Sequence, residues 1–296
     1  MRLNFQDSYN EALFVVHCII LPAILGCALA SCFLRKWRGI RRSTLVAYNL
    51  AVLTTLASFA LFIGLEARQA LVQRVFYNDE AGFTATYRPI QILVVFAVGF
   101  DYIFRIATLI AVTLLAIAVA DSPGRRRFLK IFLIVVSVLL AALTVTTFGL
   151  EGHFVDVITP LRGTDSSEDF QASAEGQAYW LPRKIYIGVA FFALYLVSVL
   201  AILAVSIQSR NWPLRFALVQ LLFITILATT STSWSAKFYQ DLFGGGYYEN
   251  PDYYNSYYAF SYVEAILEVS LQAGLLMALL FVPQSFRNGE AAHTKV

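Results

Sequence analysis

Four charged residues lie inside long apolar stretches of the chain, in two pairs with helical spacing. Asp101 and Arg105 are four positions apart in one stretch, and Glu264 and Glu268 are four positions apart in another. Side chains at this spacing are neighbours on one face of an α-helix. A charge at the centre of a bilayer costs about 2.5–3.5 kcal/mol on insertion scales, so such residues usually face the protein interior and pair with one another.

Arg105 is the one cation among these four residues, and its pairing decides how the carboxylates are neutralised. Glu268 lies about 9 Å further into its stretch than Tyr262, at a rise of 1.5 Å per residue. We therefore expect Arg105 to bridge two helices by pairing with Glu268, with Asp101 as its second partner. The alternative is a self-neutralising pair of Asp101 and Arg105 without further function, which would leave Glu268 without a cation. Glu264 lies within about one turn of the predicted boundary, where water can reach it.

Carboxylates in apolar spans occur in three kinds of membrane protein. They line the binding site of a receptor-like or sensory protein, or they mark the pathway of a transporter or lipid translocator. They also act as general acids in a membrane-embedded enzyme, for which Glu268 and Asp101 would be the candidates. Nothing in the sequence brings these carboxylates to a substrate rather than to Arg105, so no catalytic residue is assigned and a non-enzymatic function is favoured.

Further polar residues lie at a similar predicted depth in other stretches. His17 lies in the first stretch, and hydroxyl residues fill the end of the sixth, from Thr229 to Ser235. Small hydroxyl residues commonly mediate helix packing in membranes, and each of these residues alone is explained in that way. Together they predict an outward-opening polar cavity, which is the candidate ligand site. Its expected residues are Asp101, Arg105, Glu264, Glu268, His17, Thr229, Thr232 and Ser233.

The elements that must position these residues are seven apolar stretches. Of the 296 residues, 58% are hydrophobic and 14% are charged, whereas a soluble domain has about 25% charged residues. A bilayer core of about 30 Å requires roughly 20 apolar residues in a helix. The sequence therefore predicts an all-α integral membrane protein, a seven-transmembrane-helix bundle that forms a single domain over residues 1–296. The expected spans are residues 12–34, 44–65, 90–120, 129–150, 185–207, 216–235 and 262–282.

The charges of the connectors predict how the bundle is oriented. The connectors after the first, third and fifth stretches, together with the carboxyl-terminal tail, carry thirteen Lys and Arg against two carboxylates. The opposite side carries eight cations against fourteen carboxylates. Because cytosolic connectors are enriched in Lys and Arg, the amino terminus is expected outside and the carboxyl terminus in the cytosol. Trp37 and Trp212 fall at the expected cytosolic boundary, and Trp180 and Trp234 at the outer one.

The connectors on the predicted outer side are long. Residues 66–89 contain an apolar stripe with helical spacing that continues the second span or lies along the interface. The polar run 164–169 is interpreted as an acidic loop. Residues 237–261 are rich in tyrosine, whose rings either rest at the headgroup level or contact a ligand or partner. Because the connectors on this side are longer than those on the other, a lid or vestibule that faces outward is favoured.

Proline positions agree with these boundaries. Only Pro22 is expected inside a span, where it should kink the first helix. The other prolines, Pro89 and Pro182 among them, are expected in or beside connectors. A missing backbone N–H costs little there, because no helical hydrogen bond depends on it.

The sequence also excludes several kinds of site. The formal net charge of +3 is too small to indicate nucleic-acid binding. The three histidines, at positions 17, 153 and 293, are too scattered for a metal site, and no Gly-rich phosphate loop or Cys-x-x-Cys pair occurs. Neither a metal nor another cofactor is therefore expected. The spans lack the acidic-Arg-aromatic triplet and the Asn-Pro-x-x-Tyr segment of G-protein-coupled receptors, so the shared number of helices is an analogy alone.

These observations favour a receptor-like or sensory membrane protein that binds a small apolar or amphipathic ligand in an outward-facing polar cavity. The alternatives are a transporter or lipid translocator and a membrane-embedded enzyme. The expected partners are the lipid bilayer and, at the basic cytosolic face, anionic lipid headgroups. The plasma membrane is the default location and an endomembrane the alternative. The sequence specifies neither the ligand, nor the oligomeric state, nor a cytosolic partner.

Overall fold

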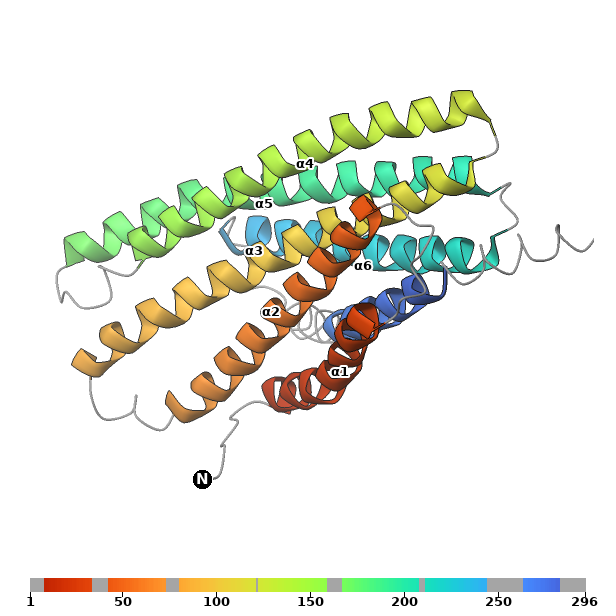
Figure 1. The fold of residues 1–296 in the computed structure, drawn as a ribbon. Helices are drawn as coiled ribbons and strands as arrows, with labels where there is room; N and C mark the ends of the chain where they lie inside the picture. The colour runs from red at the N-terminus through yellow and green to blue at the C-terminus, as the bar shows by residue number, and fades with distance from the viewer. Residues whose placement is uncertain are drawn as a thin grey trace, which may run out of the picture.

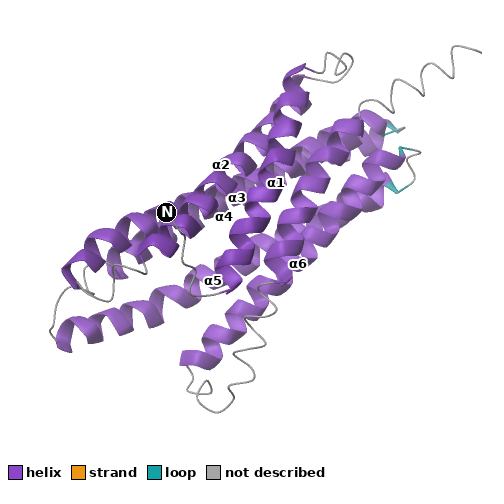
Figure 2. Cartoon of the chain, turned by 90° about the horizontal axis from the view of Figure 1, so that it is seen from below, coloured by secondary structure: helices purple, strands orange, loops and turns teal. Residues whose placement is uncertain are grey.

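The chain is helical throughout the part that the computed structural model describes. The described residues are 8–33, 42–72, 80–120, 122–158, 167–207, 211–243 and 263–282. Within these ranges every regular element is an α-helix (Figure 2). The helices are α1 (Ser8–Phe33), α2 (Arg42–Val72), α3 (Glu80–Val119), α4 (Pro123–Ile158), α5 (Ser167–Ser206), α6 (Trp212–Phe243) and a C-terminal helix (Val263–Val282).

The described ranges contain seven helices that are long and apolar enough to cross a membrane, which confirms the all-helical, multi-span prediction. Each apolar span coincides closely with a stretch predicted from the sequence. Hydropathy and length define both, and a run of about 20 apolar residues is a strong signal. The spans are Phe14–Ser31, Arg42–Leu65, Pro89–Val119, Pro123–His153, Pro182–Ser206, Trp212–Trp234 and Val263–Val282.

Six helices continue beyond their apolar spans, which the hydropathy pattern does not predict. The extended ends are Ser8 of α1, Val72 of α2, Glu80 of α3, Ile158 of α4, Ser167 of α5 and Phe243 of α6. Because successive helices alternate in direction, all six extensions lie at the same end of the bundle (Figure 1). The α2 and α5 extensions are rich in Ala, Glu and Gln, which favour helix. The loss of hydropathy therefore ends the span without ending the helix.

Two proline predictions are wrong for this reason. Pro89 lies inside α3 and Pro182 lies inside α5, and neither is in a connector. Each is the first residue of an apolar span, at the junction with the polar extension of its helix. Backbone groups freed by a proline can be satisfied by water or side chains at such a junction. Pro22 lies inside α1, as predicted.

One prediction about the long connectors is corrected, and for another the structure favours one of the two alternatives. The run 164–169 is not all loop, because α5 begins at Ser167, so that Glu168 and Asp169 fall in the first turn of the helix. Acidic side chains are favourable there, since they face the positive end of the helix dipole. The stripe in residues 66–89 continues the second span, as α2 reaches Val72. Most of the tyrosine-rich segment, residues 244–261, lies outside the described residues.

α3 is the central helix of the bundle. It packs along α2 and α4 and also touches α5 and α6. Its span Pro89–Val119 is 67% buried, whereas the Pro123–His153 span of α4 is 17% buried. α4 lies along the edge of the bundle beside α5 (Figure 1). Asp101 and Arg105 are therefore on the helix that has the least exposure to lipid.

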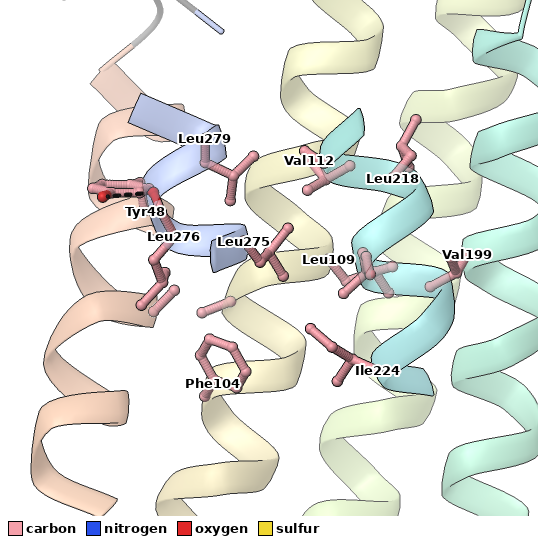
Figure 3. Packing of buried hydrophobic residues seen from close by; sticks show 14 of the residues in the cluster. Tyr48, Phe104, Leu109, Val112, Val199, Leu218, Ile224, Leu275, Leu276 and Leu279 are labelled. Atoms are coloured by element: carbon pink, nitrogen blue, oxygen red, sulfur yellow. Dashed lines mark hydrogen bonds between the residues drawn. The ribbon is translucent and has the colours of Figure 1, made fainter. Parts of the chain in front are cut away.

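The C-terminal helix packs against α2, α3 and α6. The Tyr48 hydroxyl of α2 donates a hydrogen bond to the carbonyl oxygen of Leu276 at 3.2 Å. Gly274 faces α6, where a Cβ would lie 3.0 Å from Nε2 of Gln220. This packing fixes how the C-terminal helix lies along α3. Figure 3 shows part of the apolar core that these helices share, including Phe104, Leu109, Val112, Leu218, Ile224, Leu275 and Leu279.

Candidate ligand-binding site

Asp101 and Arg105 form an ion pair along one face of α3. Arg105 Nε donates to Asp101 Oδ2 at 2.8 Å, one helical turn away. The arginine side chain is 3% exposed and the aspartate side chain 25% exposed. Breaking a buried ion pair by removing one partner costs about 3–5 kcal/mol, because the other charge stays buried. The central helix therefore depends on the pairing of this arginine.

A second carboxylate reaches Arg105 from the C-terminal helix. Arg105 Nη2 donates to Glu268 Oε1, which joins residues 163 positions apart in the chain. Gln272, one turn further along, donates from Nε2 to Asp101 Oδ1 and to Glu268 Oε1 at 3.3 Å each. The bridge between the third and seventh spans is thus present in the structure, with both of the partners that the sequence predicts for Arg105.

Aromatic rings of α5 also contact Arg105. The guanidinium carbon lies 4.8 Å from the centre of the Phe192 ring, within the range of a cation–π interaction. Tyr195 donates its hydroxyl proton to the backbone carbonyl oxygen of Arg105 at 2.9 Å. The remaining guanidinium nitrogen, Nη1, is buried and has no hydrogen-bond partner in the described part of the chain. Arg105 is therefore held by carboxylates of two helices and by an aromatic ring of a third.

A cavity of about 300 Å³ adjoins this network. It lies among α1, α2, α3 and the C-terminal helix, and its volume is at the lower end of the range for small-molecule sites, about 300–1,000 Å³. One part of its wall is polar and another is aromatic. The polar residues are Asp101, Arg105, Glu264, Glu268 and Gln272, and the rings belong to His17, Phe59 and Phe62.

His17 belongs to the aromatic part of the wall. Its ring stacks on Phe62, with centres 5.8 Å apart and planes at 14°. It meets Phe59 edge-on, with centres 5.1 Å apart and planes at 85°. The histidine is 5% exposed. Its ring packs against two rings of α2 in the wall of the cavity.

Glu264 is buried, although its position near the end of the span led us to expect it within reach of water. It is 9% exposed, lines the cavity and lies beside Glu268 and Ser231. Ser231 is on α6 and lies within the apolar span Trp212–Trp234. The packing of α6 beside the first turn of the C-terminal helix therefore keeps Glu264 from water, and hydropathy does not predict that packing.

Among the hydroxyl residues of α6, Ser231 lies beside Glu264, but the three that were predicted for the site do not line this cavity. Thr229 and Ser233 line a second pocket of about 460 Å³ together with Thr230, Trp234 and Lys237. The hydroxyl of Thr229 donates to the carbonyl oxygen of Thr225 at 2.6 Å. Threonines inside helices often bond back to the preceding turn in this way. These two predicted residues therefore do not meet the charged cluster.

Thr232 also lies away from the charged cluster. Its hydroxyl donates to the carbonyl oxygen of Ala228 at 2.7 Å. Its methyl carbon faces α5, where it would lie 3.5 Å from a Cβ built at Gly188. Thr232 therefore serves helix packing between α5 and α6. The structure thus gathers five of the eight predicted site residues around one cavity and places the three hydroxyl residues on a different helix.

Two residues of the network were not predicted from the sequence. Gln272 follows Glu268 by four positions, and this spacing is a signal that a search for polar pairs would have found. Phe192 gives no such signal, because an aromatic residue in an apolar span more often faces lipid or other apolar side chains. Only the packing of α5 against α3 places its ring at Arg105.

Neither a metal-binding group in the described part of the chain nor a related protein indicates what this site binds. Within the described ranges, no group of three His, Cys, Asp or Glu side chains could hold a metal ion. Comparison of the chain with protein-family models, with curated proteins and with solved structures gives no match. The function is therefore inferred from the geometry of the site.

Proposed function

We propose that this chain is a receptor-like or sensory membrane protein that binds a small ligand in the cavity among α1, α2, α3 and the C-terminal helix. The observation that carries the proposal is the position of this cavity. A space of about 300 Å³ lies within the apolar spans and is lined by buried charged side chains. Ionisable residues inside a membrane are costly, and they usually serve a function when they face an internal cavity.

The two parts of the cavity wall support an apolar or amphipathic ligand. Phe59 and Phe62 offer apolar surface, and Glu268 and Gln272 offer polar atoms at the same cavity. Ligand sites typically combine a mostly apolar lining with a few polar groups that fix the orientation of the ligand. A small molecule with one polar end and an apolar body matches this division.

The proposed cavity faces outward. The charge difference between the two sets of connectors supports an outer amino terminus and a cytosolic carboxyl terminus. In that orientation the helix extensions at Val72, Glu80 and Ile158 project on the outer side. Asp101 lies nearer the outer end of the apolar span Pro89–Val119 than its inner end, so water and ligand would enter from outside. Trp37, one of the predicted boundary residues, lies outside the described residues.

The plasma membrane is our proposed location, and lipid headgroups are the proposed partners at the inner face. Arg125, Arg126 and Arg127 lie in the first two turns of α4, at the end of the bundle that the orientation places in the cytosol. A basic residue close to an anionic lipid surface contributes about 1 kcal/mol to the attraction. The basic end of α4 therefore suits contact with anionic headgroups.

A transporter is the second candidate, because intramembrane charges often mark a pathway. The ion pair of Arg105 with Glu268 argues against it. This pair joins the central helix to the C-terminal helix, and a substrate that passed between the two helices would have to open it. A binding protein can keep the network closed while a ligand occupies the adjoining cavity.

The proposal can be tested with the purified full chain in detergent. A library of small amphipathic molecules would be screened for ligands that raise the thermal unfolding temperature. A ligand at a hundred times its Kd stabilises the folded state by about 2.7 kcal/mol. Val98 lines the cavity, so we expect Val98→Trp to fill it and to abolish the stabilisation. Thr230→Trp, in the second pocket, is the matched control and should leave the stabilisation intact.

Two results would contradict the proposal. Stabilisation that persists in Val98→Trp would place the ligand elsewhere. Accumulation of the ligand inside protein-containing liposomes, lost in Arg105→Met, would support the transporter instead.

A further inference from the structure

The polar wall of the cavity carries an excess of negative charge. Three carboxylates, Asp101, Glu264 and Glu268, face it together with a single guanidinium, that of Arg105. With His17 uncharged, the formal charge of this cluster is −2. One proton shared between Glu264 and Glu268 would still leave −1. Buried charges need partners, and Arg105 alone cannot supply them.

Glu264 is the carboxylate that the network leaves without a cation. Asp101 and Glu268 both bond to Arg105, whereas Glu264 forms no ion pair in the described part of the chain and lies beside Glu268 and Ser231. It is 9% exposed and lines the cavity. An uncompensated carboxyl group is therefore buried at the edge of an empty space, which is where a cationic group would be stabilised.

The aromatic part of the wall suits an organic cation better than an inorganic one. Phe59 and Phe62 line the same cavity, and ring faces attract cations within about 6 Å. A metal ion would need several ligands in a fixed geometry, and the described residues contain no group of three that could hold one. An anion could approach Nη1 of Arg105, but it would meet three carboxylates in the same wall.

We infer that the ligand is a small protonated amine with a compact apolar body, whose ammonium group lies at Glu264 and Glu268 and whose body lies against Phe59 and Phe62. This inference rests on the proposed ligand-binding function and makes it more specific. The ammonium group supplies the charge that Arg105 cannot, and the apolar body fills a cavity of about 300 Å³. Arg105 keeps its place in the ion-pair network.

The charge of the cavity can be measured with thiol reagents of opposite charge. Ala265 lines the cavity, and Ala265→Cys would be made in the full chain after replacement of Cys18, Cys27 and Cys32. The reagents are the trimethylammonium-ethyl and the sulfonato-ethyl methanethiosulfonates, with rates expressed relative to a small thiol in solution. Ser233→Cys, in the second pocket beside Lys237, is the reference position.

We expect the cationic reagent to be favoured at position 265 by on the order of tenfold, because a charged cleft concentrates counter-ions by at least this factor. The preference should fall in Glu264→Gln, persist in Glu264→Asp, and be absent at position 233. 2-Phenylethylamine should slow the modification at position 265, and the neutral analogue 2-phenylethanol at the same concentration should not.

The possible failures separate the two proposals. If both reagents react equally at position 265, the cavity is open but does not select cations, and the amine inference is wrong while the ligand cavity stands. If the amine and the alcohol protect equally, or if neither protects, the amine inference is also wrong. If neither reagent reacts at position 265 while position 233 does react, the cavity is closed to water, and the proposed function itself fails.

Discussion

Of the neighbouring helices α3 and α4, the less apolar one, α3, is the more buried. The α4 span has a mean hydropathy of 2.7 and is 17% buried, whereas the α3 span has a mean hydropathy of 2.3 and is 67% buried. In a soluble protein the more apolar helix is the more buried one. In a bilayer the lipid tails are as apolar as a leucine side chain, so an apolar residue is equally stable facing lipid or the protein interior. Hydropathy therefore no longer predicts which residues are buried.

The buried and exposed residues of the two helices make the same point. Val138 and Val145 of α4 are 63% and 73% exposed. Arg105 and Thr113 of α3 are buried, and the Thr113 hydroxyl donates to the carbonyl oxygen of Leu109 at 2.6 Å. Lipid can solvate valine but not a guanidinium group. The residues that lipid cannot solvate therefore identify the buried helix.

The largest test of this contrast removes the buried charge from α3. Arg105→Met leaves Asp101 and Glu268 without a cation, and we expect a loss of about 3–5 kcal/mol in the free energy of unfolding. Thermal unfolding in detergent and expression level would measure it. Arg126→Met is the matched control on α4, where the arginine is exposed and bonds to a backbone carbonyl. We expect that variant to lose less than about 1 kcal/mol.

A charge exchange separates the ion pair from the loss of a large side chain. Arg105→Glu combined with Glu268→Arg should recover expression that either single variant loses. If the double variant is no better than the worse single variant, the pairing of α3 with the C-terminal helix does not stabilise the bundle.

The next test makes one substitution on both helices. Leu109 of α3 is 1% exposed and Leu139 of α4 is 48% exposed. Leu109→Ala should cost about 2 kcal/mol, the lower end of the range for buried leucines, because packing contacts are lost but no water is involved. Leu139→Ala should cost less than about 0.5 kcal/mol. Chemical or thermal unfolding of both variants checks this, and equal losses would mean that α4 is as tightly packed as α3.

A smaller effect is expected from the aromatic contact with Arg105. Phe192→Leu removes a ring whose centre lies 4.8 Å from the guanidinium carbon. Cation–π interactions contribute from about 0.5 kcal/mol at exposed sites to about 2 kcal/mol or more when desolvated, so we expect a loss of about 1–2 kcal/mol. Phe128→Leu on α4, where the ring is 50% exposed, should change the unfolding temperature little. Similar losses in the two variants would show that the ring contributes only its size.

The sequence predicts the membrane spans well and the ends of the helices poorly. Hydropathy over 20 residues identifies every described span, because the bilayer imposes one length on all of them. It fails at Glu80 and Phe243, where the helix continues in polar sequence. The burial of Glu264 was missed for another reason, because it depends on the packing of Ser231 of α6 beside it, which hydropathy does not predict.

The charged centre of the site was predictable, but its surroundings were not. Charged side chains such as Asp101, Arg105 and Glu268 are costly in lipid. Because Arg105 is the one cation among these residues, the carboxylates are expected to pair with it. Thr229 and Thr232 are not costly in the same way, since a hydroxyl can bond to its own helix. Their position along the span therefore says nothing of the direction in which they face. That direction depends on how α6 is rotated against α5, which is a property of packing.

The smallest effect is expected where α3 and α4 meet. A Cβ at Gly99 would lie 3.0 Å from Cδ2 and Cε2 of Phe148 on α4. Phe148 is 40% exposed, so its ring can move toward lipid, and Gly99→Ala should cost less than about 1 kcal/mol because better helix propensity offsets part of the clash. Gly26→Ala meets nothing within 4 Å and should be neutral or stabilising. Thermal unfolding of the two variants measures the difference. If Gly99→Ala costs as much as Leu109→Ala, then the Phe148 ring cannot move toward lipid, and α4 is packed rigidly against α3.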